Sequence, residues 1–177
     1  MVIFDAGILI KLLDPRTSDI QRDKLDYLVV RLQRSKTKIL IPTPALSEFY
    51  VKADPDVLAS FKGRSAFIIA PFDEKAAIEC AISVRDAVRS GKKKGVQDAA
   101  PWQKVKFDHQ IVAIAKVHRA TCIYSEDEGL RNFAASLGLS AQCTEELQEN
   151  PESKQQKLDL NMEGDGAIPP PNDSRRK

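Results

Sequence analysis

The chain has 177 residues, of which 42% are hydrophobic and 29% charged, a composition typical of one globular domain. Its 27 lysines and arginines nearly balance its 25 aspartates and glutamates, so a basic surface for nucleic acid would have to be local. The three cysteines form no CxxC motif, which argues against a disulfide scaffold or a zinc ribbon and favours a reducing compartment. No apolar run is long enough to cross a membrane, and no basic segment precedes the apolar N-terminus as in a signal peptide. We therefore expect a cytoplasmic protein without a membrane partner.

The last thirty residues differ from the rest of the chain. Residues 148–177 contain only five apolar side chains, no aromatic one, and four of the ten prolines. Such a segment cannot bury enough apolar surface to offset the entropy lost on ordering. We expect a folded domain over residues 1–147 and a disordered tail over residues 148–177. The alternative is that the tail becomes ordered on a partner or a neighbouring subunit.

Short β-rich runs alternate with helical patterns along the predicted domain. Strands are expected at 2–4, 38–41, 66–70, 121–124 and 140–143, and helices at 7–13, 18–35, 43–53, 54–63, 74–89, 107–119 and 128–137. Thr43 as N-cap with Pro44 at the first helical position predicts where the third helix begins. The alternation predicts an α/β fold with three layers, in which helices cover both faces of a mostly parallel sheet. In such folds the functional site lies at the carboxyl ends of the strands.

Four acidic residues follow predicted strands, where that rule places a site. Asp5 follows the first strand, Glu48 lies early in the helix after the second, Asp108 opens the helix at 107–119, and Asp127 follows the strand at 121–124. Each of them could simply cap a helix or interact favourably with its dipole. The hydrophobic pattern argues for more, because Asp108 shares a helical face with apolar residues and Asp5 interrupts an apolar N-terminus. A carboxylate that faces a core must be paired, protonated or bound to a metal.

Convergence of these four carboxylates would require a cation. Like charges in a small volume do not all remain ionised without compensation. Oxygen ligands without histidine or cysteine companions favour Mg²⁺ or Mn²⁺ over zinc. A metal of this kind activates water and neutralises phosphate charge, so the pattern indicates phosphoryl chemistry.

The order of these acids resembles that of the PIN-domain nucleases, most closely the VapC-type toxin ribonucleases of toxin–antitoxin pairs. The matching pieces are Val2-Ile3-Phe4-Asp5, Thr43-Pro44-Ala45-Leu46-Ser47-Glu48-Phe49, Asp108-His109-Gln110-Ile111-Val112-Ala113-Ile114-Ala115 and Tyr124-Ser125-Glu126-Asp127. The resemblance covers residues 1–147. Ser125 matches the hydroxyl residue expected two positions before the last aspartate, whereas Gly7 stands where the family often has serine, asparagine or threonine.

The resemblance implies a PIN-like fold and an endoribonuclease that depends on Mg²⁺ or Mn²⁺. Asp5, Glu48, Asp108 and Asp127 would be the catalytic residues and the metal ligands, directly or through water, and Ser125 would support them. It also implies an RNA substrate, an antitoxin that blocks the site, and a homodimer. The alternatives are a catalytically weak or inactive PIN-fold module that binds RNA or protein, and a nuclease directed at DNA.

A basic segment precedes the third acid. Residues 90–106 are expected to form a loop in which Lys104 and Lys106 contact RNA phosphates. The alternative is a solvated lysine-rich surface. His109, beside Asp108, is a candidate for contact with the substrate, although a histidine in this position could also face solvent.

Overall fold

A computed structural model describes residues 1–52, 66–89 and 102–152 of the chain. The helix predicted at 54–63 and the tail from residue 153 onward lie outside the described residues. Within the described part, no helix is both long and apolar enough to cross a membrane.

The described strands form one parallel sheet. They are β1 (Val2–Phe4), β2 (Ile39–Pro42), β3 (Phe67–Ala70), β4 (Cys122–Tyr124) and β5 (Ser140–Gln142). Their order across the sheet is β3-β2-β1-β4-β5, and each neighbouring pair runs parallel. The first strand of the chain is therefore central, because it pairs with β2 on one side and with β4 on the other. The prediction of a mostly parallel sheet is confirmed, and each predicted strand lies within one residue of the observed one at either end.

Helices follow most strands and largely match the predicted ranges. They are α1 (Ala6–Leu13), α2 (Asp19–Arg34), α3 (Thr43–Lys52), α5 (Glu74–Arg89), α6 (Trp102–Val117), α7 (Glu128–Ser136) and the short 3₁₀ helix η1 (Thr144–Glu146). The predicted N-cap at Thr43 is wrong, because α3 already begins at this residue. The Thr43 hydroxyl instead accepts a hydrogen bond from the backbone N–H of Phe72 at 3.0 Å. It thus links α3 to the segment after β3.

The predicted loop at 90–106 is also wrong for its last residues. Helix α6 begins at Trp102, so Lys104 and Lys106 lie in its first turns. The burial of Val105 accounts for this early start of the helix, because its side chain lies on the same buried face as that of Val112 two turns later. Both lysines therefore project from a regular helix rather than from a loop.

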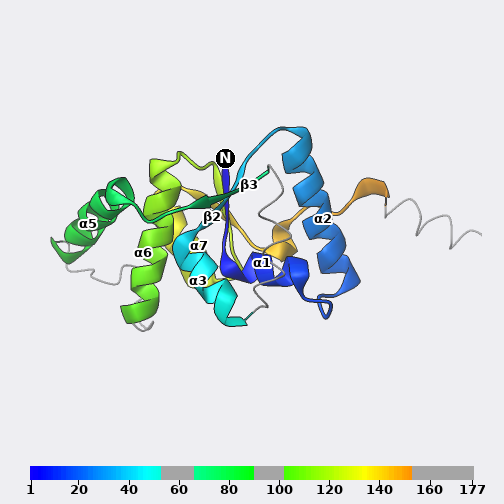
Figure 1. Cartoon of the computed structure of the whole chain (residues 1–177), viewed down its shortest axis with the longest axis horizontal. Helices are drawn as coiled ribbons and strands as arrows, with labels where there is room; N and C mark the ends of the chain where they lie inside the picture. Colours follow the sequence, from blue (N-terminus) through cyan, green and yellow to red (C-terminus); the bar gives the residue numbers. More distant parts are fainter. Residues whose placement is uncertain (53–65, 90–101, 153–177) are drawn as a thin grey trace, which may run out of the picture.

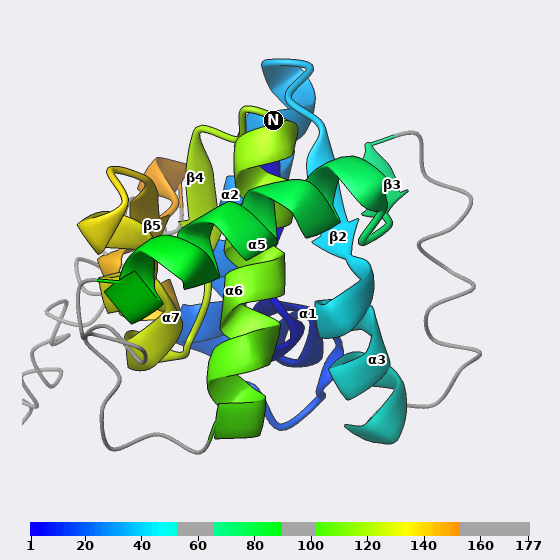
Figure 2. The same cartoon turned by 90° about the vertical axis from the view of Figure 1, so that its left-hand side faces the viewer.

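Two hydrophobic cores lie on opposite faces of the sheet and give the fold three layers. Alternate side chains of β1 belong to opposite cores. Val2 and Phe4 pack with residues of α1 and α2, whereas Ile3 packs with residues of α6 and α7. Figure 1 shows α2 on one side of the sheet and α5 and α6 on the other. Helix α5 crosses the outer side of α6 (Figure 2). The predicted three-layer α/β architecture is confirmed.

Candidate active site

The four predicted acids come from different elements at the carboxyl edge of the sheet. Asp5 directly follows β1, Glu48 lies on the helix after β2, Asp127 follows β4, and Asp108 lies on α6. The charges of Asp5 and Asp127 act on Glu48, and those of Asp108 and Glu48 act on Lys104. The pKa of Glu48 is raised by partial burial and then by the negative charge of Asp5, with a smaller contribution from Asp127. The topology thus brings together residues that are far apart in sequence.

Asp5 is one of the two buried acids of this group, together with Asp108. Its residue is only 7% exposed, and although it stands at the N-cap position of α1, its side chain makes no capping hydrogen bond. Its Oδ2 accepts instead a hydrogen bond of 2.7 Å from the hydroxyl of Ser125. Burial raises the pKa of Asp5, and the hydrogen bond from Ser125 offsets this only in part. A buried carboxylate held away from the usual capping role is suited to bind a cation.

Ser125 links the ends of the two central strands. It is fully buried, and its hydroxyl both donates to Asp5 and accepts from the backbone N–H of Asp127 at 3.0 Å. The backbone N–H of Asp5 also donates to the carbonyl of Tyr124 at 3.0 Å, which extends the pairing of β1 with β4 by one residue. One hydroxyl therefore fixes the relative positions of two of the four acids.

Asp127 has two different partners. Its Oδ1 caps α7 by accepting the backbone N–H of Leu130 at 3.1 Å. Its Oδ2 pairs with the Lys104 ammonium at 2.6 Å. Partial burial would raise the pKa of Asp127, but the hydrogen bonds from Lys104 and from the backbone outweigh it and the pKa is lowered. The helix-cap alternative considered for each acid therefore describes part of what Asp127 does.

Lys104 belongs to the acidic group rather than to a separate basic surface. It precedes Asp108 by one turn on α6, so the two residues share a face of the helix. The ion pair with Asp127 raises the pKa of Lys104, and the charges of Asp108 and Glu48 act in the same direction. Lys106 is exposed on the same helix.

The structure contradicts the predicted role of His109. The residue is 3% exposed, and its ring lies 4.3 Å from that of Phe133 on α7, measured between ring centres. Burial lowers the pKa of His109, which favours the neutral ring. A side chain packed between two helices does not contact a substrate, and it does not face solvent either. The spacing of Val105, His109 and Val112 along α6 places all three on one buried face.

Gly7 and Glu126 form a contact that sequence reasoning missed. A β-carbon on Gly7 would lie 3.2 Å from Cβ of Glu126, so the glycine makes room for this side chain. The Glu126 carboxylate pairs with Lys11 of α1 at 2.8 Å and accepts hydrogen bonds from the backbone N–H and the hydroxyl of Thr144. Glu126 thus joins α1 to η1 directly beside Asp127. The only signal in the sequence was the glycine itself, in a place where the resembled family often has a polar residue.

The candidate ligands suit a hard cation in chemistry but do not surround one point. They are carboxylates only, which is the donor set that Mg²⁺ and Mn²⁺ prefer. In the part of the chain that the structure describes, no three histidine, cysteine, aspartate or glutamate side chains are close enough together to hold one metal ion. The Lys104 ammonium instead supplies positive charge at Asp127. The donor set thus fits a divalent cation by its chemistry alone.

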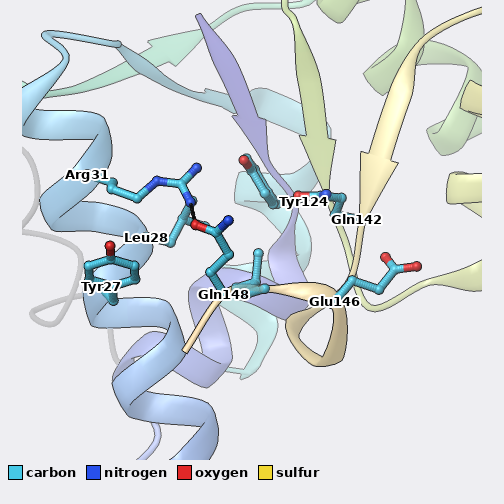
Figure 3. Close-up of a pocket in the computed structure, with 8 residues that line it drawn as sticks. Tyr27, Leu28, Arg31, Tyr124, Gln142, Glu146 and Gln148 are labelled. Carbon is cyan, nitrogen blue, oxygen red and sulfur yellow. Dashed lines mark hydrogen bonds between the residues drawn. The ribbon is translucent and has the colours of Figure 1, made fainter. Parts of the chain in front are cut away.

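A separate cavity of about 190 Å³ lies between α2 and the segment that follows β5. Figure 3 shows the residues that line it, among them Tyr27 and Arg31 of α2, Tyr124 of β4, and Gln148. The Arg31 guanidinium donates a hydrogen bond to the Gln148 side chain across it. None of the four acids lines this cavity. It is therefore distinct from the candidate active site.

Comparisons with known proteins agree with the geometry at the level of the fold. No protein-family model matches the sequence, and no curated protein sequence matches it significantly. Among solved structures, the chain is similar to one from VapBC2 of Rickettsia felis bound to a promoter DNA fragment, with a TM-score of 0.56 and 16% identity, covering 81% of this chain and 98% of that one.

Two further structures give the same result. A chain of DNA-bound VapBC from Salmonella typhimurium has a TM-score of 0.52 at 16% identity, covering 81% of this chain and 97% of that one. VapC20 of Mycobacterium tuberculosis, a toxin that cleaves the sarcin–ricin loop, has a TM-score of 0.50 at 12% identity, covering 78% of this chain and 96% of that one. The chain therefore has the PIN-like fold of the VapC toxins.

Proposed function

We propose that this protein is a metal-dependent endoribonuclease of the VapC toxin type. The observation that carries the proposal is the placement of Asp5, Glu48, Asp108 and Asp127 after or beside the strands of a PIN-like sheet, with Ser125 joining Asp5 to Asp127. The fold shared with VapC20, a toxin that cleaves the sarcin–ricin loop, supports RNA as the substrate. The fold shared with VapBC complexes supports an antitoxin as the partner. A homodimer stays a prediction from the resemblance.

The proposed mechanism assigns separate roles to the residues. Mg²⁺ or Mn²⁺, when bound, would supply an activated water and neutralise charge on the scissile phosphate. Asp5, Asp108 and Asp127 would hold the cation, and Glu48, the most exposed of the four, would bind it or orient the water. Ser125 would keep Asp5 and Asp127 at a fixed separation. Lys104 and Lys106 lie on the first turns of α6, where they could meet the incoming RNA backbone.

The experiment that tests the proposal measures cleavage and metal binding together. A structured RNA hairpin and a single-stranded RNA are incubated with the wild type and with Asp108→Asn, in Mn²⁺ and in EDTA. We expect cleavage only by the wild type with Mn²⁺, and calorimetric Mn²⁺ binding that Asp108→Asn abolishes. Labelled single-stranded DNA as competitor separates a ribonuclease from the alternative nuclease directed at DNA. Cleavage by Asp108→Asn at the wild-type rate, or by the wild type in EDTA, would refute the mechanism.

One observation favours the alternative of a catalytically weak binding module. The ion pair between Lys104 and Asp127 engages a carboxylate oxygen that a metal would need, and no three described acids are grouped around one point. A protein of this kind would bind RNA without cleaving it. A gel-shift experiment in EDTA, followed by the same RNA in Mn²⁺, distinguishes retained binding without cleavage from nuclease activity.

A further inference from the structure

Lys104 occupies an unusual place for a lysine. It is the third residue of α6, where the partial positive charge of a helix N-terminus disfavours a cation. Its ammonium nevertheless lies 2.6 Å from Oδ2 of Asp127, so the pair joins the N-terminus of α6 to the N-terminus of α7. The side chain is directed to the acids rather than spread into solvent.

The surroundings of Lys104 explain this position. Three of the four acids act on its pKa, first Asp127 through the ion pair and then Asp108 and Glu48 through their charges. The same lysine lowers the pKa of Glu48 and of Asp127, so its charge compensates more than one carboxylate. Lys104 thus compensates the charge of Asp127 by direct contact and interacts favourably with the charges of Glu48 and Asp108.

The ion pair is also easy to open. The Lys104 side chain is 44% exposed and that of Asp127 is 29% exposed, so water screens the attraction between them. Exposed pairs of this kind contribute about 1 kcal/mol or less to the free energy of unfolding. A divalent cation carries twice the charge and prefers carboxylate oxygens, so it competes well for the same atom.

We propose that Lys104 is an internal counter-ion that holds Asp127 in the metal-free protein and exchanges with the divalent cation when the site is loaded. The inference rests on the proposed function, because it assigns the cation to the same carboxylates. After exchange the ammonium stays attached to α6 one turn before Asp108, at the border of the site, where the phosphate of an RNA substrate is its next partner. Lys104 would then link loading of the metal to capture of the substrate.

The test compares Mn²⁺ binding by calorimetry in the wild type, Lys104→Met, Lys104→Arg and Lys106→Met. Lys106→Met is the matched control, because it removes one positive charge from the same turns of α6 at an exposed position. We expect Lys104→Met to bind Mn²⁺ about fivefold more tightly, the equivalent of an exposed ion pair worth about 1 kcal/mol. Lys104→Arg should bind like the wild type, and Lys106→Met within about twofold of it.

A second readout needs no metal. In EDTA, Lys104→Met should melt at a lower temperature than Lys106→Met, because it leaves the acidic group without its counter-ion. If the wild type binds Mn²⁺ and Lys104→Met binds it no more tightly than Lys106→Met, the exchange is overturned while the proposed function stands. If the wild type binds no Mn²⁺, the metal-dependent function and the exchange both fail. Equal melting temperatures in EDTA would overturn the counter-ion role itself.

Discussion

Replacing Ser125 with alanine tests the most connected contact of the candidate site. The Ser125 hydroxyl is fully buried, donates to the Asp5 carboxylate at 2.7 Å and accepts the backbone N–H of Asp127 at 3.0 Å. A hydrogen bond to a charged group contributes about 1.5–3 kcal/mol and a neutral one about 1 kcal/mol. We therefore expect Ser125→Ala to lower the free energy of unfolding by about 3 kcal/mol, which corresponds to a fall in Tm of roughly 6–12 °C for a chain of this size.

The measurement is urea unfolding at pH 7 in EDTA, with Ser136→Ala as the matched control. The Ser136 hydroxyl also makes a hydrogen bond of 2.7 Å, but Ser136 is exposed and its partner is the backbone carbonyl of Phe133 in the same helix. Its removal should change the free energy of unfolding by less than about 0.5 kcal/mol.

The pH dependence of Ser125→Ala identifies which part of the loss involves Asp5. The wild-type hydroxyl stabilises the ionised form of Asp5 and so lowers its pKa, although burial keeps this pKa above the ordinary value. The contribution of the hydroxyl is present at neutral pH and decreases as the pH falls through the pKa of Asp5 in the folded protein. In an Asp5→Asn background, Ser125→Ala should cost at least about 1 kcal/mol less. A cost below about 0.5 kcal/mol, or an equal cost in both backgrounds, would refute the reasoning.

Three further substitutions follow from the same contacts. Asp5→Asn should stabilise the metal-free protein by about 1 kcal/mol at pH 7 while abolishing Mn²⁺ binding. Since burial raises the pKa of Asp5, this gain in stability should disappear as the pH falls through that pKa. Thermal unfolding in EDTA measures the gain, and a gain independent of pH would contradict the prediction. Gly7→Val should lower the free energy of unfolding by about 2 kcal/mol, because even a β-carbon at this position would lie 3.2 Å from Cβ of Glu126. An unchanged urea midpoint would show that the packing around Gly7 is loose. His109→Phe should have a free energy of unfolding within about 1 kcal/mol of the wild type and keep any RNA cleavage. The reason is that Nδ1 of His109 is buried without a hydrogen-bond partner and the ring packs on Phe133. Loss of cleavage in a folded variant would instead indicate that His109 contacts the substrate.

The sequence predicted the fold well because its signals are local. Short apolar runs bounded by turn residues located the five strands, and Gly138, with φ of 76°, lies directly after the C-cap of α7. Asp73 directly precedes α5 and accepts a hydrogen bond from the backbone N–H of Ala76 in the first turn of that helix. Patterns of this kind depend on neighbours within one or two turns, which a single sequence contains.

The errors arose where distant residues decide the outcome. Thr43 has the identity of an N-cap, but its hydroxyl is engaged by Phe72, 29 residues further along the chain. The sequence pattern predicts Lys104 in a basic loop, because its partner Asp127 lies far along the chain and no local pattern joins the two residues. The burial of His109 could have been found, since Val105 and Val112 flank it at helical spacing.

The candidate site itself was predicted only as a set of residues. Their order along the chain indicated the edge of the sheet where they would meet, and the parallel topology brings them there. The connections between them, through the hydroxyl of Ser125 and the ammonium of Lys104, require the three-dimensional arrangement.

The link between Asp5 and Ser125 joins residues 120 positions apart, and this separation has a consequence during synthesis. A ribosome delivers β1 first, but the strand that pairs with its other edge, and the last acid, come only after α6. Domains form as their segments emerge, at about 5–20 residues per second. A nascent chain that ends before Asp127 thus has an open edge on β1 and an incomplete set of acids. A protein with the proposed site would therefore complete its set of acids only after Asp127 has emerged from the ribosome.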